Sequence, residues 1–221
     1  MRGKFITFEG GEGSGKSTHA ATLAQRLKSL DIDCVLTREP GGSAGAEIVR
    51  HIILSGIAKP LGAETETILF AAARDDHVRM TIEPALAAGI WVISDRFIDS
   101  TRVYQGALGK VDMKLIRGLE RVTVGATMPD LTVVLDVPSN IGLARAKSRR
   151  GGGAADRFEA ESPEYHDDLR RGFLVLAERE PKRIVVIDGR APRDVVAEKI
   201  WDAVENRLLG GHAKPKETAA P

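Results

Sequence analysis

A glycine-rich stretch near the N-terminus constrains the fold of this 221-residue chain more than any other feature. It occupies residues 10–18, after an apolar run at 5–8 and before a segment with helical periodicity. The stretch fits the pattern G-x-x-x-x-G-K-[ST] in the strand–loop–helix context in which that pattern binds phosphate. The glycines let successive backbone N–H groups surround a phosphate, and the helix N-terminus adds partial positive charge. We predict a nucleoside triphosphate site, with a chance match in a glycine-rich turn as the alternative.

The residue types in this loop suggest separate tasks. Lys16 would reach the β- and γ-phosphates of the nucleotide, and the Ser17 hydroxyl would hold Mg²⁺. Glu12 would repel a triphosphate unless it faces a different ligand, so it would hold Mg²⁺ through water or accept a hydrogen bond from a sugar hydroxyl. This favours a second bound nucleotide. The candidate phosphate-binding residues are Gly10, Gly11, Glu12, Gly13, Ser14, Gly15, Lys16, Ser17 and Thr18.

Short apolar runs alternate with longer amphipathic segments along the chain, which predicts a parallel sheet with helices on both faces. Strands are expected at 4–9, 33–37, 90–94, 131–137 and 183–187. Helices are expected at 16–30, 44–56, 64–88, 98–107, 112–124, 139–149, 163–179 and 192–208. We therefore predict an α/β fold of the P-loop NTPase type, with three layers and five strands, in a single domain over 1–209. The tail at 210–221 has no apolar face and is predicted to be disordered.

The bulk composition excludes several classes of protein. The net charge is +1, so no overall field attracts nucleic acid or a membrane, and no apolar stretch approaches membrane-spanning length. The single cysteine, Cys34, rules out a disulfide within the chain, which fits a reducing cytoplasm. We expect a cytoplasmic protein that binds neither nucleic acid nor a membrane.

Charged residues follow two of the expected strands. Asp95 and Arg96 come directly after the third strand, where P-loop enzymes hold Mg²⁺ through a carboxylate and where an arginine would reach a phosphate. A plain helix-capping aspartate is the alternative. Arg38 follows the second strand in a turn with Pro40, and its guanidinium suits bidentate phosphate binding. Taken alone, that sequence indicates only a charged surface turn with no binding role.

Two further groups are ambiguous from the residues alone. Phe70 and Arg74 share one face of the helix expected over 64–88, where they could stack on a base and bond its carbonyl oxygens. A core Phe70, with Arg74 paired to Asp75 or Glu66, is the favoured alternative. The segment at about 145–160 combines arginines with three consecutive glycines, which predicts a short lid able to close over phosphates; a solvated charged face is the alternative. The candidate lid arginines are Arg145, Arg149, Arg150 and Arg157.

These residues, in this order, resemble the thymidylate kinase family from about Phe5 to about Leu208. The phosphate loop alone is shared by many families. The Arg-Glu-Pro-Gly-Gly turn, the Asp-Arg-aromatic triplet and a Tyr-Gln-Gly sequence together are specific. The segments that carry the resemblance are 8–18, 37–42, 69–74, 95–97, 100–106 and 156–159.

The resemblance implies transfer of the ATP γ-phosphoryl group to dTMP, giving dTDP and ADP with Mg²⁺, for dTTP synthesis by a homodimer. Asp95, Ser17 and Glu12 would organise the metal, and Arg38 with Arg96 would clamp the dTMP phosphate. Phe70 would stack on thymine, and Arg74 would bond its O4. The other implied dTMP neighbours are Glu12, Ser100, Thr101, Gln105 and Tyr104, the last of which would clash with a 2′-hydroxyl.

The phosphate loop itself contains no arginine, which resembles the bacterial subclass whose lid supplies the catalytic arginines. Arg149, together with Arg145, Arg150 or Arg157, would then contact the transferring phosphate. The implied catalytic set is Lys16, Arg38, Asp95, Arg96 and Arg149. One departure from the family is Arg102, an unusual charge beside the base pocket.

Two other readings stay open at this level. A kinase of the same fold with a different acceptor would share most of these features. A nucleotide-dependent switch protein would hydrolyse slowly with no acceptor, although it would leave the acceptor-side arginines without a purpose. A nucleic-acid motor fits poorly, because the chain is short and nearly neutral.

Overall fold

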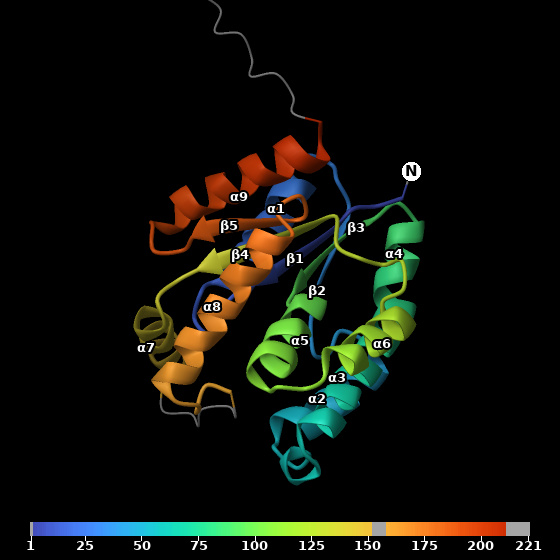
Figure 1. Ribbon diagram of the computed structural model, residues 1–221. Coiled ribbons are helices and arrows are strands. Elements are labelled where there is room, and N and C mark those ends of the chain that lie inside the picture. The colour runs from blue at the N-terminus through green and yellow to red at the C-terminus, as the bar shows by residue number, and fades with distance from the viewer. Residues whose placement is uncertain (1, 152–157, 211–221) are drawn as a thin grey trace, which may run out of the picture.

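One parallel sheet forms the centre of the computed structural model, which describes residues 2–151 and 158–210. In this part of the chain the strand order is β2-β3-β1-β4-β5, with every neighbouring pair parallel (Figure 1). The strands are β1 (Phe5–Glu9), β2 (Cys34–Arg38), β3 (Trp91–Asp95), β4 (Leu131–Asp136) and β5 (Ile184–Asp188). The predicted α/β fold with five parallel strands is confirmed.

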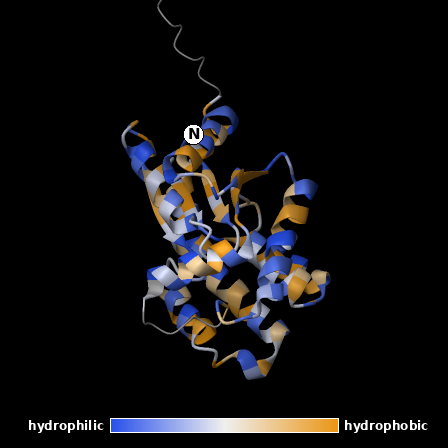
Figure 2. Ribbon diagram, turned by 90° about the vertical axis from the view of Figure 1, so that its left-hand side faces the viewer, coloured by the Kyte–Doolittle hydropathy of each residue, from blue (hydrophilic) through white to orange (hydrophobic). Residues whose placement is uncertain are grey.

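The central strands are buried on both faces, as their unbroken apolar runs predict. All of β1 is buried, as are β3 and β4 except for their last residues, Asp95 and Asp136. Figure 2 shows hydrophobic residues concentrated in the strands and hydrophilic ones on the outer helix surfaces. The two polar strand ends lie at the carboxyl edge of the sheet, where parallel sheets bind ligands.

Helices connect the strands and cover both faces. The α-helices are α1 (Lys16–Lys28), α2 (Ala44–Leu54), α3 (Ala63–His77), α4 (Glu83–Ala87), α5 (Ile98–Thr101), α6 (Met113–Thr123), α7 (Ser139–Arg150), α8 (Pro163–Arg179) and α9 (Arg193–Leu208). Shorter or wider helical segments are η1 (Lys59–Leu61), η2 (Val78–Ile82) and η3 (Arg102–Leu108).

Alternate residues along the strands point to two different helix layers. Ile6 and Phe8 of β1 pack in one core with apolar residues of α1 and α9, such as Leu23 and Val204. Phe5, on the opposite face of β1, packs with η2 and α4, and further along that face α8 and η3 cover β4. Figure 1 shows the resulting three layers, with the sheet in the middle.

Two expected helices contain stretches of wider, π-helical turns. The helix expected over 64–88 is α3, η2 and α4 in succession, with the π-helical segment just before Pro84. Proline has no N–H to donate and its ring excludes the carbonyl four residues earlier, so a regular α-helix cannot continue through it. The helix expected over 98–107 changes at Arg102 from α5 into the π-helical η3. Such widened turns are frequent at functional sites.

Candidate active site

The glycine-rich loop lies between β1 and α1 and depends on glycine at several positions, among them Gly13 and Gly15. Gly13 has a φ of +66°, and a Cβ there would lie 1.9 Å from the carbonyl oxygen of Gly142. Gly15 has a φ of +98° and is the N-cap of α1. Only a residue without a side chain adopts these conformations at no steric cost. The loop thereby presents the N-terminus of a long helix at the carboxyl edge of the sheet, an arrangement suited to anions.

Lys16, the first residue of α1, folds back over this loop. Its Nζ donates to the carbonyl oxygens of Gly11 at 2.7 Å and Gly10 at 3.1 Å. The side chain is buried, and burial lowers the pKa of its ammonium, with the nearby Arg96 acting in the same direction. The ammonium therefore lies within the loop, in reach of any phosphate that the loop amides bind.

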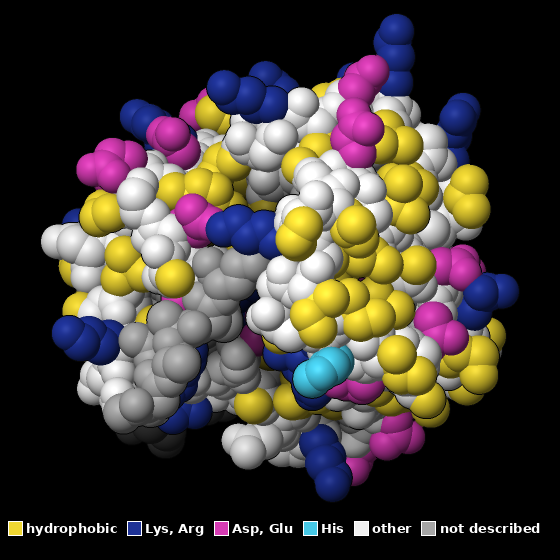
Figure 3. Space-filling model, turned by 90° about the horizontal axis from the view of Figure 1, so that it is seen from below, with side chains coloured by type: hydrophobic (Ala, Val, Ile, Leu, Met, Phe, Trp, Pro, Cys, Tyr) yellow, Lys and Arg dark blue, Asp and Glu magenta, His cyan; other side chains and the backbone are white. Residues whose placement is uncertain are grey.

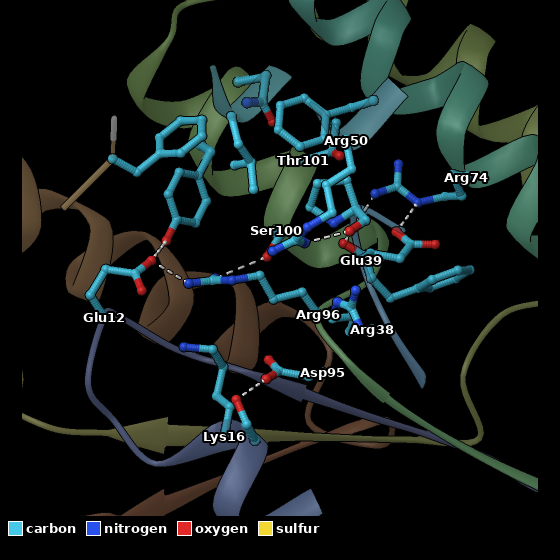
Figure 4. A pocket seen from close by; sticks show the side chains of 18 of the residues that line it. Glu12, Lys16, Arg38, Glu39, Arg50, Arg74, Asp95, Arg96, Ser100 and Thr101 are labelled. Atoms are coloured by element: carbon cyan, nitrogen blue, oxygen red, sulfur yellow. Dashed lines mark hydrogen bonds and ion pairs between the residues drawn. The ribbon is translucent and has the colours of Figure 1, made fainter. Parts of the chain in front are cut away.

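Ser17 and Asp95 meet at the carboxyl edge of the sheet. The Ser17 hydroxyl donates to Oδ2 of Asp95, the last residue of β3. A hydroxyl and a carboxylate in contact are a suitable partial ligand set for Mg²⁺, which takes its other ligands from water and phosphate oxygens. Glu12, the third expected metal residue, lies elsewhere: Figure 4 shows Lys16 and Arg96 between Glu12 and Asp95. The described residues contain no cluster of three or more metal-ligating His, Cys, Asp or Glu side chains.

Glu12 instead forms a hydrogen-bonded cluster with Arg96 and Tyr104. Arg96 Nη2 donates to Glu12 Oε1 at 2.5 Å, and the Tyr104 hydroxyl donates to the same oxygen at 3.1 Å. Burial alone would raise the pKa of Glu12, but Arg96 and Lys16 outweigh it and lower that pKa to about 2. Glu12 is therefore ionised at neutral pH, and its charge is balanced within the site.

Glu9, the last residue of β1, is a buried carboxyl that the sequence analysis missed. It accepts hydrogen bonds from the backbone N–H of Phe97 at 2.8 Å and from the hydroxyl of Ser100 at 2.6 Å. Burial and the nearby Asp99 raise its pKa to about 7. Its position at the end of a mostly apolar strand, directly before the loop, was the available signal. Glu9 fixes the start of α5, and with it Ser100.

Arg38 ends β2 and lines the cavity beside the phosphate loop. Its guanidinium pairs with Glu47 of α2 at 2.9 Å, and both side chains are exposed. Arg50, a cavity-lining residue absent from our predictions, donates to the carbonyl oxygen of Pro40 at 2.6 Å. Arg38, at the end of β2, and Arg50, on α2, therefore both contribute guanidinium groups to the lining of the cavity.

The far end of the cavity is aromatic. Phe70 of α3 lies 6.4 Å from Phe158 between ring centroids, and Phe158 meets Tyr104 edge to face at 5.5 Å. The Thr101 hydroxyl is buried there and has no hydrogen-bond partner among the described residues. Arg74 lies close by and pairs with Glu39, a partner the sequence analysis did not consider. This pocket has the flat walls and polar groups that a base requires.

The expected lid arginines have different surroundings. Arg149 lines the cavity, is largely exposed and lies 3.9 Å from Glu159. Arg145 Nη1 instead donates to the carbonyl oxygen of Gly189 at 3.0 Å, next to β5. The side chain of Arg150 and all of Arg157 lie outside the described residues, as do 152–157 of the lid and 211–221 of the tail.

Arg102 does not face the base pocket, contrary to its expected place. Its guanidinium contacts Asp99, Glu120 of α6 and Glu180. The unusual charge is therefore satisfied on the side of η3 away from the cavity.

A single cavity of about 230 Å³ brings most of the predicted residues together. The predicted residues that line it are Glu12, Gly13, Gly15, Lys16, Ser17, Arg38, Phe70, Arg74, Asp95, Arg96, Ser100, Thr101, Tyr104, Gln105 and Arg149. Those that do not are Gly10, Gly11, Ser14, Thr18 and Arg145. Lining residues that were not predicted include Glu39, Pro40, Arg50, Leu54 and Phe97.

A phosphate loop and a second, arginine-rich pocket on one parallel sheet define a P-loop nucleotide kinase. The family model described as "Thymidylate kinase" matches residues 8–200. The chain belongs to the thymidylate kinase family.

Individual relatives agree with this assignment. The thymidylate kinase of Nitrobacter winogradskyi is 57% identical over 220 residues, covering 100% of this chain and 96% of that protein. That of a Bradyrhizobium species is 59% identical over 208 residues, covering 94% of this chain and 92% of that protein. The crystal structure of thymidylate kinase from Ehrlichia chaffeensis superposes with a TM-score of 0.73 at 31% identity, over 93% of this chain and 99% of that one. In the part of the chain that the structure describes, no helix is both long and apolar enough to span a bilayer.

Proposed function

We propose that this chain transfers the γ-phosphoryl group of ATP to dTMP, giving ADP and dTDP, in the synthesis of dTTP for DNA replication. The observation that carries the proposal is one cavity that is lined by Lys16 and Ser17 as well as by Phe70 and Arg74. Figure 4 shows Lys16 and Arg74 on opposite sides of it. Phosphoryl transfer requires that donor and acceptor be held in line in a shared, sheltered space. The family assignment supports the same reaction.

On the donor side, the loop amides and Lys16 bind the ATP phosphates. Ser17 and Asp95 would hold Mg²⁺, which would supply positive charge to the phosphate groups of ATP. The contact between the two side chains supports this assignment. Loop residues 10–18 as a group provide the phosphate site.

On the acceptor side, Arg38 and Arg96 bind the phosphate of dTMP, whose oxygen attacks the γ-phosphorus. That phosphate is already largely a dianion near neutral pH, so the reaction needs no general base. Arg96 suits the task because Glu12 and the Ser100 hydroxyl hold its guanidinium at the centre of the cavity. Placement, together with charge neutralisation, supplies most of the catalysis in this chemistry.

The base and sugar of dTMP occupy the aromatic end of the cavity. Phe70 stacks on thymine, and Arg74 donates to its O4. Thr101 and Gln105 bond the polar edge of the base; the buried, unpartnered hydroxyl of Thr101 supports this role. Tyr104, held by Glu12, packs against the sugar where a 2′-hydroxyl would clash.

The lid, at about 145–160, supplies charge for the transferring group. Arg149 is the favoured arginine, because it lines the cavity whereas Arg145 does not. Arg145, Arg150 and Arg157 complete the proposed set, with Arg145 acting from beside Gly189.

We also propose that the enzyme is a cytoplasmic homodimer. Exposed apolar side chains occur on three adjacent helices: Ile48 on α2, Ile68 on α3 and Val122 on α6. Figure 3 shows hydrophobic side chains gathered on the side of the molecule that carries α3 and α6 in Figure 1. An apolar field of this kind is typical of a subunit interface.

The test is ADP formation from Mg-ATP by the purified protein with dTMP, dUMP, dCMP, dGMP, AMP, UMP or no acceptor. We expect strong turnover with dTMP, weaker turnover with dUMP and near-background rates with the others. A preference for another monophosphate would replace dTMP as the acceptor. Equal slow hydrolysis in all samples would reject the kinase and favour a nucleotide-dependent switch.

A further inference from the structure

A buried set of hydrogen bonds lies behind the base-side wall of the cavity. Thr37 Oγ1 and His77 Nε2 are 2.8 Å apart, and His77 Nδ1 lies 3.0 Å from Glu39 Oε1. The other oxygen of Glu39 accepts from Arg74 Nε at 2.8 Å. His77 is fully buried, and Glu39 and Arg74 are nearly so. The reaction described above gives no task to Thr37, Glu39 or His77.

Glu39 determines how Arg74 is presented to the cavity. Arg74 Nε donates to Glu39, and Nη2 donates to the carbonyl oxygen of Phe97 at 3.3 Å. The guanidinium is planar and rigid, so fixing two of its nitrogens fixes the whole group. Its Nη1 is then left to donate at a set angle to a ligand in the cavity that Arg74 lines. Glu39 also balances a charge that would be costly to bury alone.

His77 in turn determines the position of Glu39. A carboxylate only accepts hydrogen bonds, so Nδ1 of His77 carries the proton in this pair. In the neutral ring, Nε2 is then an acceptor for the Thr37 hydroxyl, and both ring nitrogens are satisfied. The bond from Nδ1 holds Oε1 of Glu39, leaving Oε2 to meet Arg74.

The surroundings leave His77 and Thr37 little room to move. A Cβ on Gly42 would lie 2.4 Å from both His77 Nε2 and Thr37 Oγ1, so the turn backbone passes directly over their hydrogen bond. The Thr81 hydroxyl of η2 donates to the carbonyl oxygen of Gly42 at 2.8 Å. The turn after β2 is therefore fastened to the α3–η2 helix at several points, and one of these, the His77–Glu39 bond, continues to Arg74.

We propose that His77 is a positioning residue for acceptor specificity, acting through Glu39 to aim Arg74 at a base that carries a carbonyl oxygen at position 4. The inference rests on the proposed function, since it concerns how the acceptor base is recognised. dCMP has an amino group at this position, which cannot accept from Arg74. Loosening Arg74 therefore weakens the use of dTMP far more than the use of dCMP.

Two nearly isosteric substitutions separate the two bonds of His77. In His77→Asn the amide nitrogen takes the place of Nδ1 and keeps the bond to Glu39; in His77→Gln it takes the place of Nε2 and reaches only Thr37. We expect His77→Gln to raise KM for dTMP by about tenfold, the effect of losing one hydrogen bond to a charged group. The kcat/KM ratio of dTMP to dCMP falls by a similar factor, while KM for ATP is unchanged. His77→Asn stays close to the wild type.

Thr81→Val is the matched control, because it releases the same turn without touching Glu39. We expect it to lower thermal stability and leave the dTMP-to-dCMP ratio unchanged. Equal ratios in wild type and His77→Gln would overturn the positioning role, as would an equal fall in His77→Asn or Thr81→Val. A wild-type enzyme that does not phosphorylate dTMP would reject the proposed function itself, which keeps the two failures apart.

Discussion

The guanidinium of Arg96 lies 2.5 Å from the carboxylate of Glu12, which joins β3 to the phosphate loop across the middle of the cavity. The pair explains how a carboxylate can belong to a loop that binds phosphate: its negative charge is already balanced by an arginine. Arg96 itself has a φ of +71°, an unusual conformation for a side chain that is not glycine. Backbone strain of this kind concentrates at functional sites.

Replacing Lys16 by alanine should lower kcat by about 10²- to 10³-fold, because a charge aimed at the transferring group is lost. Its hydrogen bonds lie within the loop, so we expect the fold to persist, as checked by circular dichroism and thermal unfolding. Lys28→Ala, at the exposed end of the same helix, is the control and should behave as the wild type. Near-native turnover of a folded Lys16→Ala protein would contradict the phosphate-loop assignment.

Arg149→Ala should lower kcat by about 10²-fold with little change in KM for either nucleotide, because its charge is needed mainly in the transition state. Arg145→Ala should have a smaller effect, since that guanidinium is engaged by Gly189. Steady-state kinetics of the two variants side by side provides the measurement. The reverse ranking would move the catalytic role to Arg145.

Glu9 should make the folded state less stable as the pH rises from 4.5 to 7. Its pKa is 4.5 in the unfolded chain and about 7 in the folded protein, so the folded state binds its proton more tightly. The linked stability is fully present below pH 4.5 and is lost as the pH rises through 7, by about 3 kcal/mol.

The measurement is urea unfolding of the wild type and Glu9→Gln at several pH values. The variant should lack this slope, so the difference in unfolding free energy between the two proteins changes across the window. Glu12, whose pKa is lowered to about 2, affects stability only below pH 4.5 and does not overlap. A constant difference between pH 4.5 and 8 would show that Glu9 titrates normally.

Ile48→Glu should convert the proposed homodimer into monomers, because it places a charge in the apolar field on α2, α3 and α6. Val175→Glu, an exposed apolar position on α8, is the matched control and should leave the oligomeric state unchanged. Sedimentation velocity at several protein concentrations distinguishes the two results. A wild-type monomer at high concentration would remove the dimer proposal altogether.

Sequence periodicity predicted the strands to within one or two residues, because each is a short apolar run between clear turn signals. It could not predict where helices widen. The expected helix over 64–88 contains the π-helical η2, and the one over 98–107 passes into the π-helical η3. Both changes depend on packing, and the first also depends on the missing N–H of Pro84.

In the site too, features set by residues close together in the sequence were predictable, whereas features set by distant residues were not. The glycine-rich motif is contiguous in the sequence, so it was sufficient to predict a loop between the first strand and a helix that begins at Lys16. The surroundings of Arg74 were harder to predict, because its partner Glu39 is 35 residues away in the sequence and the fold brings the two together. Glu9 was missed because the signal at the end of its strand is weak, and its burial depends on residues distant in the sequence, such as Phe97 and Ser100. Arg102 lies away from the base pocket because Asp99, three residues earlier, and the distant Glu120 and Glu180 all pair with it there.

The strand order has a consequence for how such an enzyme can change. The loop after β1 and the turn after β2 are separated by β3 alone, so backbone hydrogen bonds hold them two strand spacings apart, about 10 Å. If the two nucleotides bind as proposed, the sheet therefore fixes the distance between the one that gives the phosphoryl group and the one that receives it. Side-chain substitutions in the base pocket can select a different base without altering this spacing. Acceptor specificity can therefore change in evolution while the geometry of phosphoryl transfer stays the same.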